Sequence, residues 1–307
     1  MTNMYLNDID RRRSRTGCIA LIVLAVLLLG LLVFWLTRRS SDRVPTDDLA
    51  PPTVEAAAAK RSDDKPAEAV VPAGDRGQEW LVDAQAAREQ NDYLAARELG
   101  WRVLEESEDT LAKKDAEELL NEVNIALVMT RRPMPEKVEH TIQSGDTLGV
   151  LARRHNTTID LIRKSNNLRG DIIRVGDRLR ILDATFSIKV SKSRNDLILY
   201  MNDRFFKRYP VGTGEFATTP EGRFIIEERI PRPVWWKDGR QIPYGDPDNL
   251  LGTHYLKLDV PGYGLHGTWE PESIGYQSSA GCVRLLNEDI EELYILLPTG
   301  VEVTIID

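Results

Sequence analysis

The most hydrophobic stretch of the chain lies close to its first residue. Residues 17–37 (GCIALIVLAVLLLGLLVFWLT) carry no charged side chain. A helix of that length spans about 30 Å, the thickness of the hydrocarbon core of a bilayer. Arginines flank the run on both sides, and no small-residue cleavage site follows it. The pattern therefore favours an uncleaved transmembrane anchor over a cleaved signal peptide, with residues 1–16 forming a short tail.

Residues 38–76 differ sharply from this run in composition. They are rich in Asp, Pro, Ala, Ser and Lys and nearly free of aromatic side chains. Such a segment cannot bury enough apolar surface to offset the entropy lost on ordering. We therefore expect a disordered linker with a coil-like span of roughly 30–40 Å, long enough to carry the following domains away from a membrane surface.

Apolar residues recur at helical spacing across 77–132. The periodicity breaks at Asn91-Asp92 and again at 107–109, which predicts three helices with Asp92 and Asp109 as N-caps. The first two helices resemble one tetratricopeptide hairpin, although an array needs about three repeats to bury its faces. A helical spacer that packs on a neighbour is favoured, and a protein partner bound at 77–132 is the alternative.

Residues 139–183 form a short unit with its own pattern. The sequence predicts a strand at 140–143, helices beginning at Leu148 and after Thr158, and a closing strand at 178–182. The opening HTIQSGDTL, the turn SNNL and the ending IIRVGDRLRIL resemble the LysM module. The resemblance implies a βααβ fold that binds glycans containing N-acetylglucosamine, here the peptidoglycan strand.

The same resemblance implies glycan contacts in two turns of this unit. They lie after the first strand and before the last one. The positions implied are Gly145, Asp146, Thr147, Asn167 and Ile173. His140 and His155 also fall in this unit, and we interpret both as structural or surface residues.

From residue 184 the pattern becomes that of β-strands and predicts a mainly-β domain over 184–307. Strands are expected at 186–193, 196–203, 204–212, 222–229, 254–260 and 301–307. The stretch 230–252 holds two tryptophans and four prolines, and we expect an irregular segment there, either a lid over a site or a packed surface loop. Asn287, followed by two acidic residues, is expected to open a helix.

Composition and charge narrow the function classes. The net charge is −8, and no segment offers a large basic face, which argues against nucleic-acid binding. Neither clustered Cys and His residues at metal-ligand spacing nor a Gly-rich phosphate loop occurs. We therefore expect no metal and no cofactor.

Cys282 is the candidate nucleophile. The chain has two cysteines, and Cys18 lies in the predicted anchor, so Cys282 has no partner for an intramolecular disulfide. His266, followed by Gly267, lies sixteen residues before Cys282, and Arg284 lies two residues after it. A free thiol with a pKa of ~8.5 needs a base or a cation nearby to react at neutral pH. The pattern indicates covalent acyl transfer and predicts a thiol pKa below the usual value.

The residues HGTWEPESIG leading into SSAGCVRL resemble the catalytic motif of the YkuD-type L,D-transpeptidases. The resemblance extends over roughly 185–307. It implies that Cys282 is the nucleophile and that His266 is its base, oriented by the backbone carbonyl of Gly267. His254 is the competing base. It also implies acylation by carbapenems in preference to penicillins.

The resemblance implies supporting roles for the residues around the thiol. Backbone amides near Gly281 and Cys282 would form the oxyanion hole, and Ser279 would support the loop. Arg284 would hold a substrate carboxylate or tune the thiol, or else form only a surface salt bridge. Ala280 departs from the many members that carry a second histidine at this position, which bears on substrate preference.

Together these features predict a membrane-anchored, extracytoplasmic enzyme whose residues 1–16 face the cytoplasm. The resemblance implies that a donor stem tetrapeptide acylates the thiol, releases its terminal D-residue and passes to an acceptor amine, in cell-wall crosslinking or protein attachment. One alternative is a hydrolytic carboxypeptidase or endopeptidase on the same scaffold. Another is a catalytically inert tether between wall and membrane. The sequence leaves the acceptor, the oligomeric state and the envelope type open.

Overall fold

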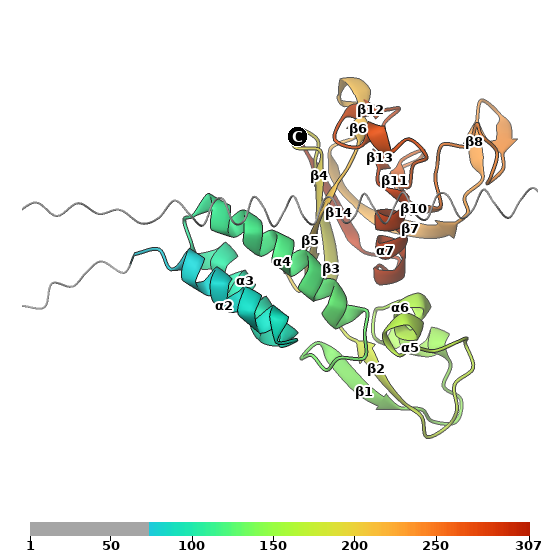
Figure 1. Cartoon of the computed structure of the whole chain (residues 1–307). Helices are drawn as coiled ribbons and strands as arrows, with labels where there is room; N and C mark the ends of the chain where they lie inside the picture. The colour runs from blue at the N-terminus through green and yellow to red at the C-terminus, as the bar shows by residue number, and fades with distance from the viewer. Residues whose placement is uncertain (1–73) are drawn as a thin grey trace, which may run out of the picture. The chain divides into compact units, whose positions relative to one another are not determined.

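The computed structural model describes residues 74–307, so the expected tail, anchor and nearly all of the linker lie outside the described residues. The described part has three segments in chain order, a group of helices, a small mixed unit and a large sheet (Figure 1). Among the helices within 74–307, none combines the length and the apolar character needed to cross a bilayer.

The first segment consists of three helices, α2 (Gly77–Glu89), α3 (Tyr93–Glu106) and α4 (Thr110–Val128). The carboxylates of Asp92 and Asp109 accept hydrogen bonds from backbone N–H groups in the first turns of α3 and α4. Such bonds satisfy donors that a helix start leaves unpaired. The expected division into three helices and both expected caps are confirmed.

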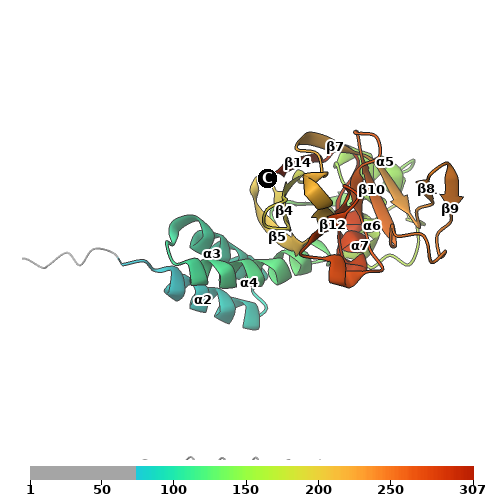
Figure 2. The same ribbon diagram turned by 90° about the horizontal axis from the view of Figure 1, so that it is seen from above.

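Side chains of these helices bind the backbone of β5 (Arg204–Pro210), the edge strand of the large sheet. Trp101 Nε1 donates to the carbonyl of Phe205 at 2.7 Å, and Asn124 Nδ2 donates to that of Phe206 at 2.8 Å. Asn121 Oδ1 accepts the N–H of Arg208 at 3.0 Å. Both views place α4 beside β5 (Figures 1 and 2). The helices therefore pack on a neighbour, as the spacer interpretation expects.

The LysM-like unit is a βααβ fold. It contains β1 (Lys137–Thr141), α5 (Leu148–Arg154), α6 (Ile159–Ser165) and β2 (Arg178–Leu182). The hydroxyls of Thr147 and Thr158 cap the two helices. The expected strand at 140–143 was placed too late, because β1 pairs antiparallel with the whole of β2 and that register begins at Lys137 opposite Leu182.

The large sheet has eight strands in the order β13, β11, β10, β7, β14, β3, β4, β5. Pairing is antiparallel except between β14 and β3 and between β11 and β13. A short parallel pair, β6 with β12, lies apart from it. The strands not yet bounded are β3 (Phe186–Ser191), β4 (Asp196–Met201), β6 (Thr213–Gly214), β7 (Gly222–Pro231), β10 (His254–Leu258), β11 (Gly264–His266), β12 (Gln277–Ser279), β13 (Val283–Arg284) and β14 (Glu302–Ile306).

The stretch 230–252 corrects the expectation of an irregular segment. It contains an antiparallel hairpin, β8 (Trp235–Lys237) with β9 (Arg240–Ile242). Its turn is formed by Asp238 and Gly239, both at positive φ. An Asp-Gly pair is a strong hairpin signal. The four prolines of this stretch favoured an irregular segment over a hairpin in the sequence-based prediction.

Helix α7 (Asn287–Leu296) exists as expected, but Asn287 does not cap it. Its side-chain Oδ1 accepts the N–H of Thr253 at 3.0 Å, and its Nδ2 donates to the carbonyl of Thr268 at 2.9 Å. Asn287 instead ties together two loops, one of which follows β11. Two short 3-10 turns complete the fold, η1 (Glu215–Ala217) and η2 (Pro271–Ser273).

The LysM-like unit has a small core of its own, but part of the unit is also buried in the core of the large sheet. Leu161 of α6 and Leu182 of β2 are buried in the same cluster as the sheet residues and α7. The Thr158 hydroxyl donates to the carbonyl of Ile295 in α7. Removal of residues 139–183 would therefore expose apolar surface of the catalytic domain.

Replacing Leu161 with alanine should therefore destabilise the whole of 74–307. Leu161 is 1% exposed, and a cavity at such a site costs about 2–5 kcal/mol in the free energy of unfolding. Urea unfolding followed by tryptophan fluorescence measures the loss as a shift of one transition. Ile159→Ala is the matched control on the same helix, because Ile159 is 37% exposed and should cost less. Two transitions, with only the smaller one shifted, would show that the unit folds independently.

Candidate active site

Cys282 sits on a tight loop between β12 and β13. The Ser279 hydroxyl donates to the Cys282 carbonyl at 2.7 Å and accepts the N–H of Gly281 at 3.1 Å. Gly281 has φ +134, and a Cβ there would come within 2.7 Å of the Tyr263 ring. The position accepts glycine because both the backbone conformation and the close approach exclude a side chain. Ser279 and Gly281 thus fix the loop that presents the thiol.

This loop changes the expected oxyanion hole. The N–H of Gly281 is occupied by Ser279, so it is not available to a substrate. The N–H of Cys282 donates to no atom of residues 74–307. Of the two amides expected to act together, the structure leaves the one on Cys282 as the candidate donor.

His266 lies on β11 and lines the same cavity as Cys282. Its Nδ1 is 2.6 Å from the carbonyl of Gly267. A carbonyl can only accept, so Nδ1 carries the proton and Nε2 keeps a lone pair. The pKa of His266 is lowered to about 4. Burial is the main cause and the charge of Arg284 adds to it, while the hydrogen bond to the Gly267 carbonyl acts in the opposite direction. At neutral pH the imidazole is therefore in the form that can accept a proton.

Parallel pairing of β11 with β13 brings the two halves of the motif together. Leu265 is opposite Val283, and His266 is opposite Arg284. The histidine and the residues that follow the thiol are therefore neighbours in one sheet. The sequence spacing of the motif gave no indication of this register, because both strands are only two or three residues long.

Burial raises the pKa of the Cys282 thiol, with the N–H of Gly264 and the charge of Arg284 acting in the opposite direction. The thiol lies 3.5 Å from the carbonyl of Gly262, a contact that suits a protonated sulfur. The expectation of a lowered thiol pKa was wrong. The pKa rises because His266 is neutral and supplies no positive charge, so desolvation of the thiolate outweighs the effect of Arg284 alone.

Arg284 forms a salt bridge, but not the exposed surface salt bridge that was one of the expected alternatives. Its Nη1 is 3.2 Å from Glu270 Oε2, so a salt bridge exists, but the arginine side chain is only 12% exposed. Its Nε is buried without a partner. Its backbone exchanges two hydrogen bonds with Gly212, at 2.8 and 2.9 Å. Arg284 is held firmly at the wall of the thiol cavity.

The thiol cavity has a volume of about 430 Å³. Its walls include residues from three parts of the chain, namely Glu215, Trp235, Lys237, Leu251, His266 and Arg284. Trp235 and Lys237 come from the β8–β9 hairpin, which therefore forms one wall, and the Lys237 ammonium lies 4.9 Å from the Trp235 ring centre. Sequence reasoning missed both as site residues. The adjacent tryptophans in a proline-rich stretch were the available signal.

His254 is placed away from the thiol cavity. Its ring packs on Tyr294 with centroids 4.4 Å apart, and its Nδ1 is 3.2 Å from the Thr253 hydroxyl. His140 and His155 bond Asp146 and Asp183 in the LysM-like unit. Of the four histidines, His266 is the one that lines the cavity with Cys282.

Several of the expected glycan-binding residues have structural contacts. The Asp146 carboxylate accepts hydrogen bonds from His140 and from the N–H of Gln143, at 2.8 and 2.9 Å. Thr147 caps α5, and Ile173 packs on the core of the unit. These three residues shape the turns, and their contact with a glycan stays a prediction.

The other two expected glycan contacts lie at turn positions with positive φ. Gly145 has φ +91 and Asn167 has φ 55. Asn167 also lines a cavity of about 580 Å³ shared with the end of α4. Ile172 was not singled out from the sequence, yet its side chain is 88% exposed in the same turn region.

Within residues 74–307, no three His, Cys, Asp or Glu side chains gather in a group that could hold a metal ion.

Acid should destabilise the fold through His266. Its pKa falls from 6.5 to about 4 on folding, so between these values the unfolded chain binds a proton that the folded chain does not. The contribution of His266 to the free energy of unfolding is therefore fully present above about pH 6.5 and decreases by roughly 3 kcal/mol as the pH falls to about 4. Thermal unfolding midpoints should show a smaller acid loss for His266→Gln than for wild type. His155→Gln is the control and should keep the full loss; parallel profiles for wild type and His266→Gln would contradict the assignment.

Comparisons with known proteins agree on two regions. The model of the L,D-transpeptidase catalytic domain matches residues 185–305, and that of the LysM domain matches 140–182. Two curated relatives that carry the name L,D-transpeptidase YkuD, from Bacillus licheniformis and Bacillus subtilis, are 33% and 32% identical to this chain over 174 residues. Each alignment covers 54% of this chain and 97% of the relative.

Proposed function

The chain belongs to the YkuD-type L,D-transpeptidases, and we propose that it crosslinks peptidoglycan stem peptides through a thioester on Cys282. The observation that carries the mechanism is the pairing of Cys282 with a neutral His266 in one cavity, with Nδ1 of the imidazole held by the Gly267 carbonyl. A base at this position must be unprotonated and aimed by its other nitrogen.

The reaction proceeds in two acyl-transfer steps. The sulfur of Cys282 attacks the carbonyl of the third residue of a donor tetrapeptide while Nε2 of His266 takes the thiol proton. The N–H of Cys282 stabilises the oxyanion, a contribution typically of a few kcal/mol. His266 then returns the proton to the departing amine of the terminal D-residue, which leaves a thioester. The acceptor amine loses a proton to His266 as it attacks, and the thiol re-forms.

The remaining parts serve delivery of the substrate. The LysM domain binds glycan strands, and the hydrophobic run at 17–37 anchors the chain with its catalytic domain outside the cytoplasm. Support for this arrangement is the length of the run and the apolar composition of the segment. Because Leu161 and Leu182 of the LysM domain are buried in the core of the sheet, a glycan strand bound to the LysM domain is presented to the catalytic domain in a fixed orientation.

Product analysis tests the proposal. Full-length protein is incubated with a disaccharide tetrapeptide and an acceptor amine in water enriched in ¹⁸O, and products are identified by mass spectrometry. We expect loss of the terminal D-residue with gain of the acceptor. Incorporation of ¹⁸O without acceptor would establish the hydrolytic alternative. Unchanged substrate with a folded enzyme would favour the inert tether.

A further inference from the structure

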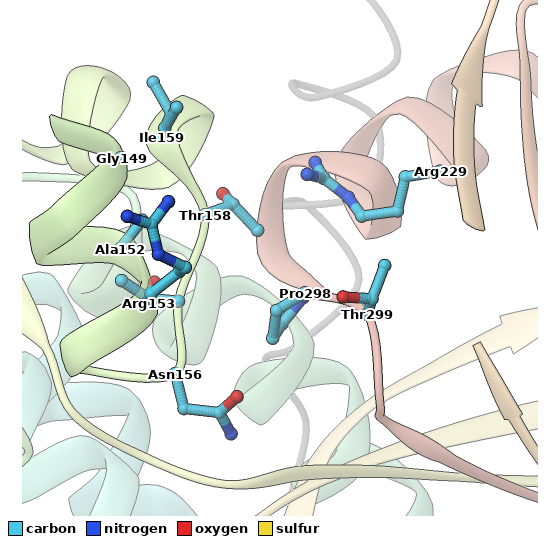
Figure 3. A pocket seen from close by; sticks show the side chains of 10 residues that line it. Gly149, Ala152, Arg153, Asn156, Thr158, Ile159, Arg229, Pro298 and Thr299 are labelled. Atoms are coloured by element: carbon cyan, nitrogen blue, oxygen red, sulfur yellow. The ribbon is translucent and has the colours of Figure 1, made fainter. Parts of the chain in front are cut away.

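A cavity of about 380 Å³ lies at the junction of the LysM domain and the catalytic domain, separate from the thiol cavity. Helices α5 and α6 supply one wall, and β7 together with residues 298–299 supplies the other (Figure 3). The polar residues that line it are Arg153, Asn156, Thr157, Thr158, Arg229 and Thr299. None of the residues assigned to catalysis reaches it.

The lining of this cavity carries two positive charges and no carboxylate. The side chain of Arg153 is exposed, and its guanidinium forms no ion pair or hydrogen bond with any residue of 74–307. Figure 3 shows it on the LysM side, with Arg229 on the opposite side. The guanidinium of Arg229 lies 4.2 Å from the Tyr294 ring centre, and its Nη2 meets Asp160 Oδ2 at 3.3 Å and the carbonyl of Tyr294, whereas its Nε has no partner. One guanidinium is thus unpaired, and the other is only partly paired.

Two polar atoms in the same walls are buried without any partner, Thr157 Oγ1 and Arg229 Nε. Thr157 is 7% exposed. Buried polar atoms in native proteins nearly always have a hydrogen-bond partner, and each exception requires an explanation. Two of the eight such atoms within 74–307 belong to residues that line this one basic cavity, so hydrogen-bonding capacity is left there for another molecule.

We propose that this cavity binds an oxyanion, a carboxylate or a phosphate group, between Arg153 and Arg229. Guanidinium groups match the planar geometry of such groups and form charge-assisted hydrogen bonds with them. Arg153 belongs to the LysM domain and Arg229 to the catalytic domain, so one anion contacts both. Binding therefore strengthens the junction that holds the glycan-binding domain against the catalytic domain, independently of transpeptidation.

Two probes distinguish the sources of the anion. Full-length protein labelled with ¹⁵N is titrated with inorganic phosphate and, separately, with acetate, at constant ionic strength set by chloride. The side-chain N–H signals of Arg153 and Arg229 report binding, and the thermal unfolding midpoint is measured in parallel. A saturable response to acetate alone identifies a carboxylate site, a response to phosphate alone identifies a phosphate site, and either supports the proposal. No saturable response to either anion overturns it.

Variants separate this site from general charge effects. Arg153→Gln should weaken anion binding about tenfold, the effect of one lost charge-assisted hydrogen bond. Arg154→Gln is the matched control, because Arg154 follows on the same helix and does not line the cavity. Thr157→Val should also weaken binding while leaving the midpoint in chloride unchanged, since its hydroxyl has no partner to lose. Equal affinity in wild type and Arg153→Gln, or an equal loss in Arg154→Gln, would overturn the site.

Discussion

Replacing Cys282 with alanine should abolish transpeptidation and leave the fold intact. The alanine methyl cannot form a thioester, and no other thiol exists within residues 74–307. Cys282 is of intermediate exposure and its side chain faces a cavity, so removing the sulfur should cost little stability even though the surrounding segments desolvate the thiol. Crosslinked muropeptides measured by chromatography should disappear while circular dichroism is unchanged. Activity above a tenth of the wild-type value would mean that another group is the nucleophile.

Acylation by a carbapenem tests directly whether Cys282 is the nucleophile. Opening of the β-lactam ring by the thiolate should add one inhibitor mass to full-length wild type and none to Cys282→Ala. Because burial raises the pKa of the thiol, the rate should keep rising with pH beyond the ordinary thiol range. An adduct that persists in Cys282→Ala would place the reactive group elsewhere in the chain.

Replacing His266 with alanine should reduce thioester formation by about two to four orders of magnitude, the range typical of a positioned general base. The raised thiol pKa makes the enzyme more dependent on this base, because little thiolate exists without it. Stopped-flow acylation by a carbapenem measures the loss. The effect should be largest near neutral pH and should shrink in alkali, where the thiol ionises unaided.

His254→Ala is the matched control for this experiment. His254 is also partly buried, and burial lowers its pKa too, but its ring packs against Tyr294 and not against the thiol cavity. We expect acylation rates close to wild type. If the large loss appears in His254→Ala and not in His266→Ala, then the base has been assigned to the wrong histidine.

The parts of the fold that sequence predicted well depend on local interactions. The helices at 77–132 follow from periodicity and from caps that act within one turn, as Asp92 and Asp109 do. The longer strands of the sheet follow from alternation along a single segment. Cys282 and His266 were expected to lie together because their motif resembles that of a family in which these two positions form the catalytic site.

The parts that sequence missed depend on residues distant along the chain. Asn287 looks like a helix cap in its local context, yet its amide bonds the loops at Thr253 and Thr268. The direction of the Cys282 pKa shift depends on how deeply other segments bury the thiol. Trp235 and Lys237 become cavity residues only once the β8–β9 hairpin is placed against the motif. The first two have no signature within a short window of sequence, and the placement of the hairpin has none beyond its adjacent tryptophans.

The contacts between the helices and β5 also cover one edge of the large sheet. An uncovered edge strand presents free N–H and carbonyl groups and can recruit a strand from another molecule. Here Trp101, Asn121 and Asn124 occupy three such groups on β5. Residues 77–132 therefore cover the β5 edge and block its pairing with a strand of another molecule. A chain that lacks residues 77–132 and keeps only the LysM and catalytic domains would expose the β5 edge. We expect such a chain to self-associate through its sheet.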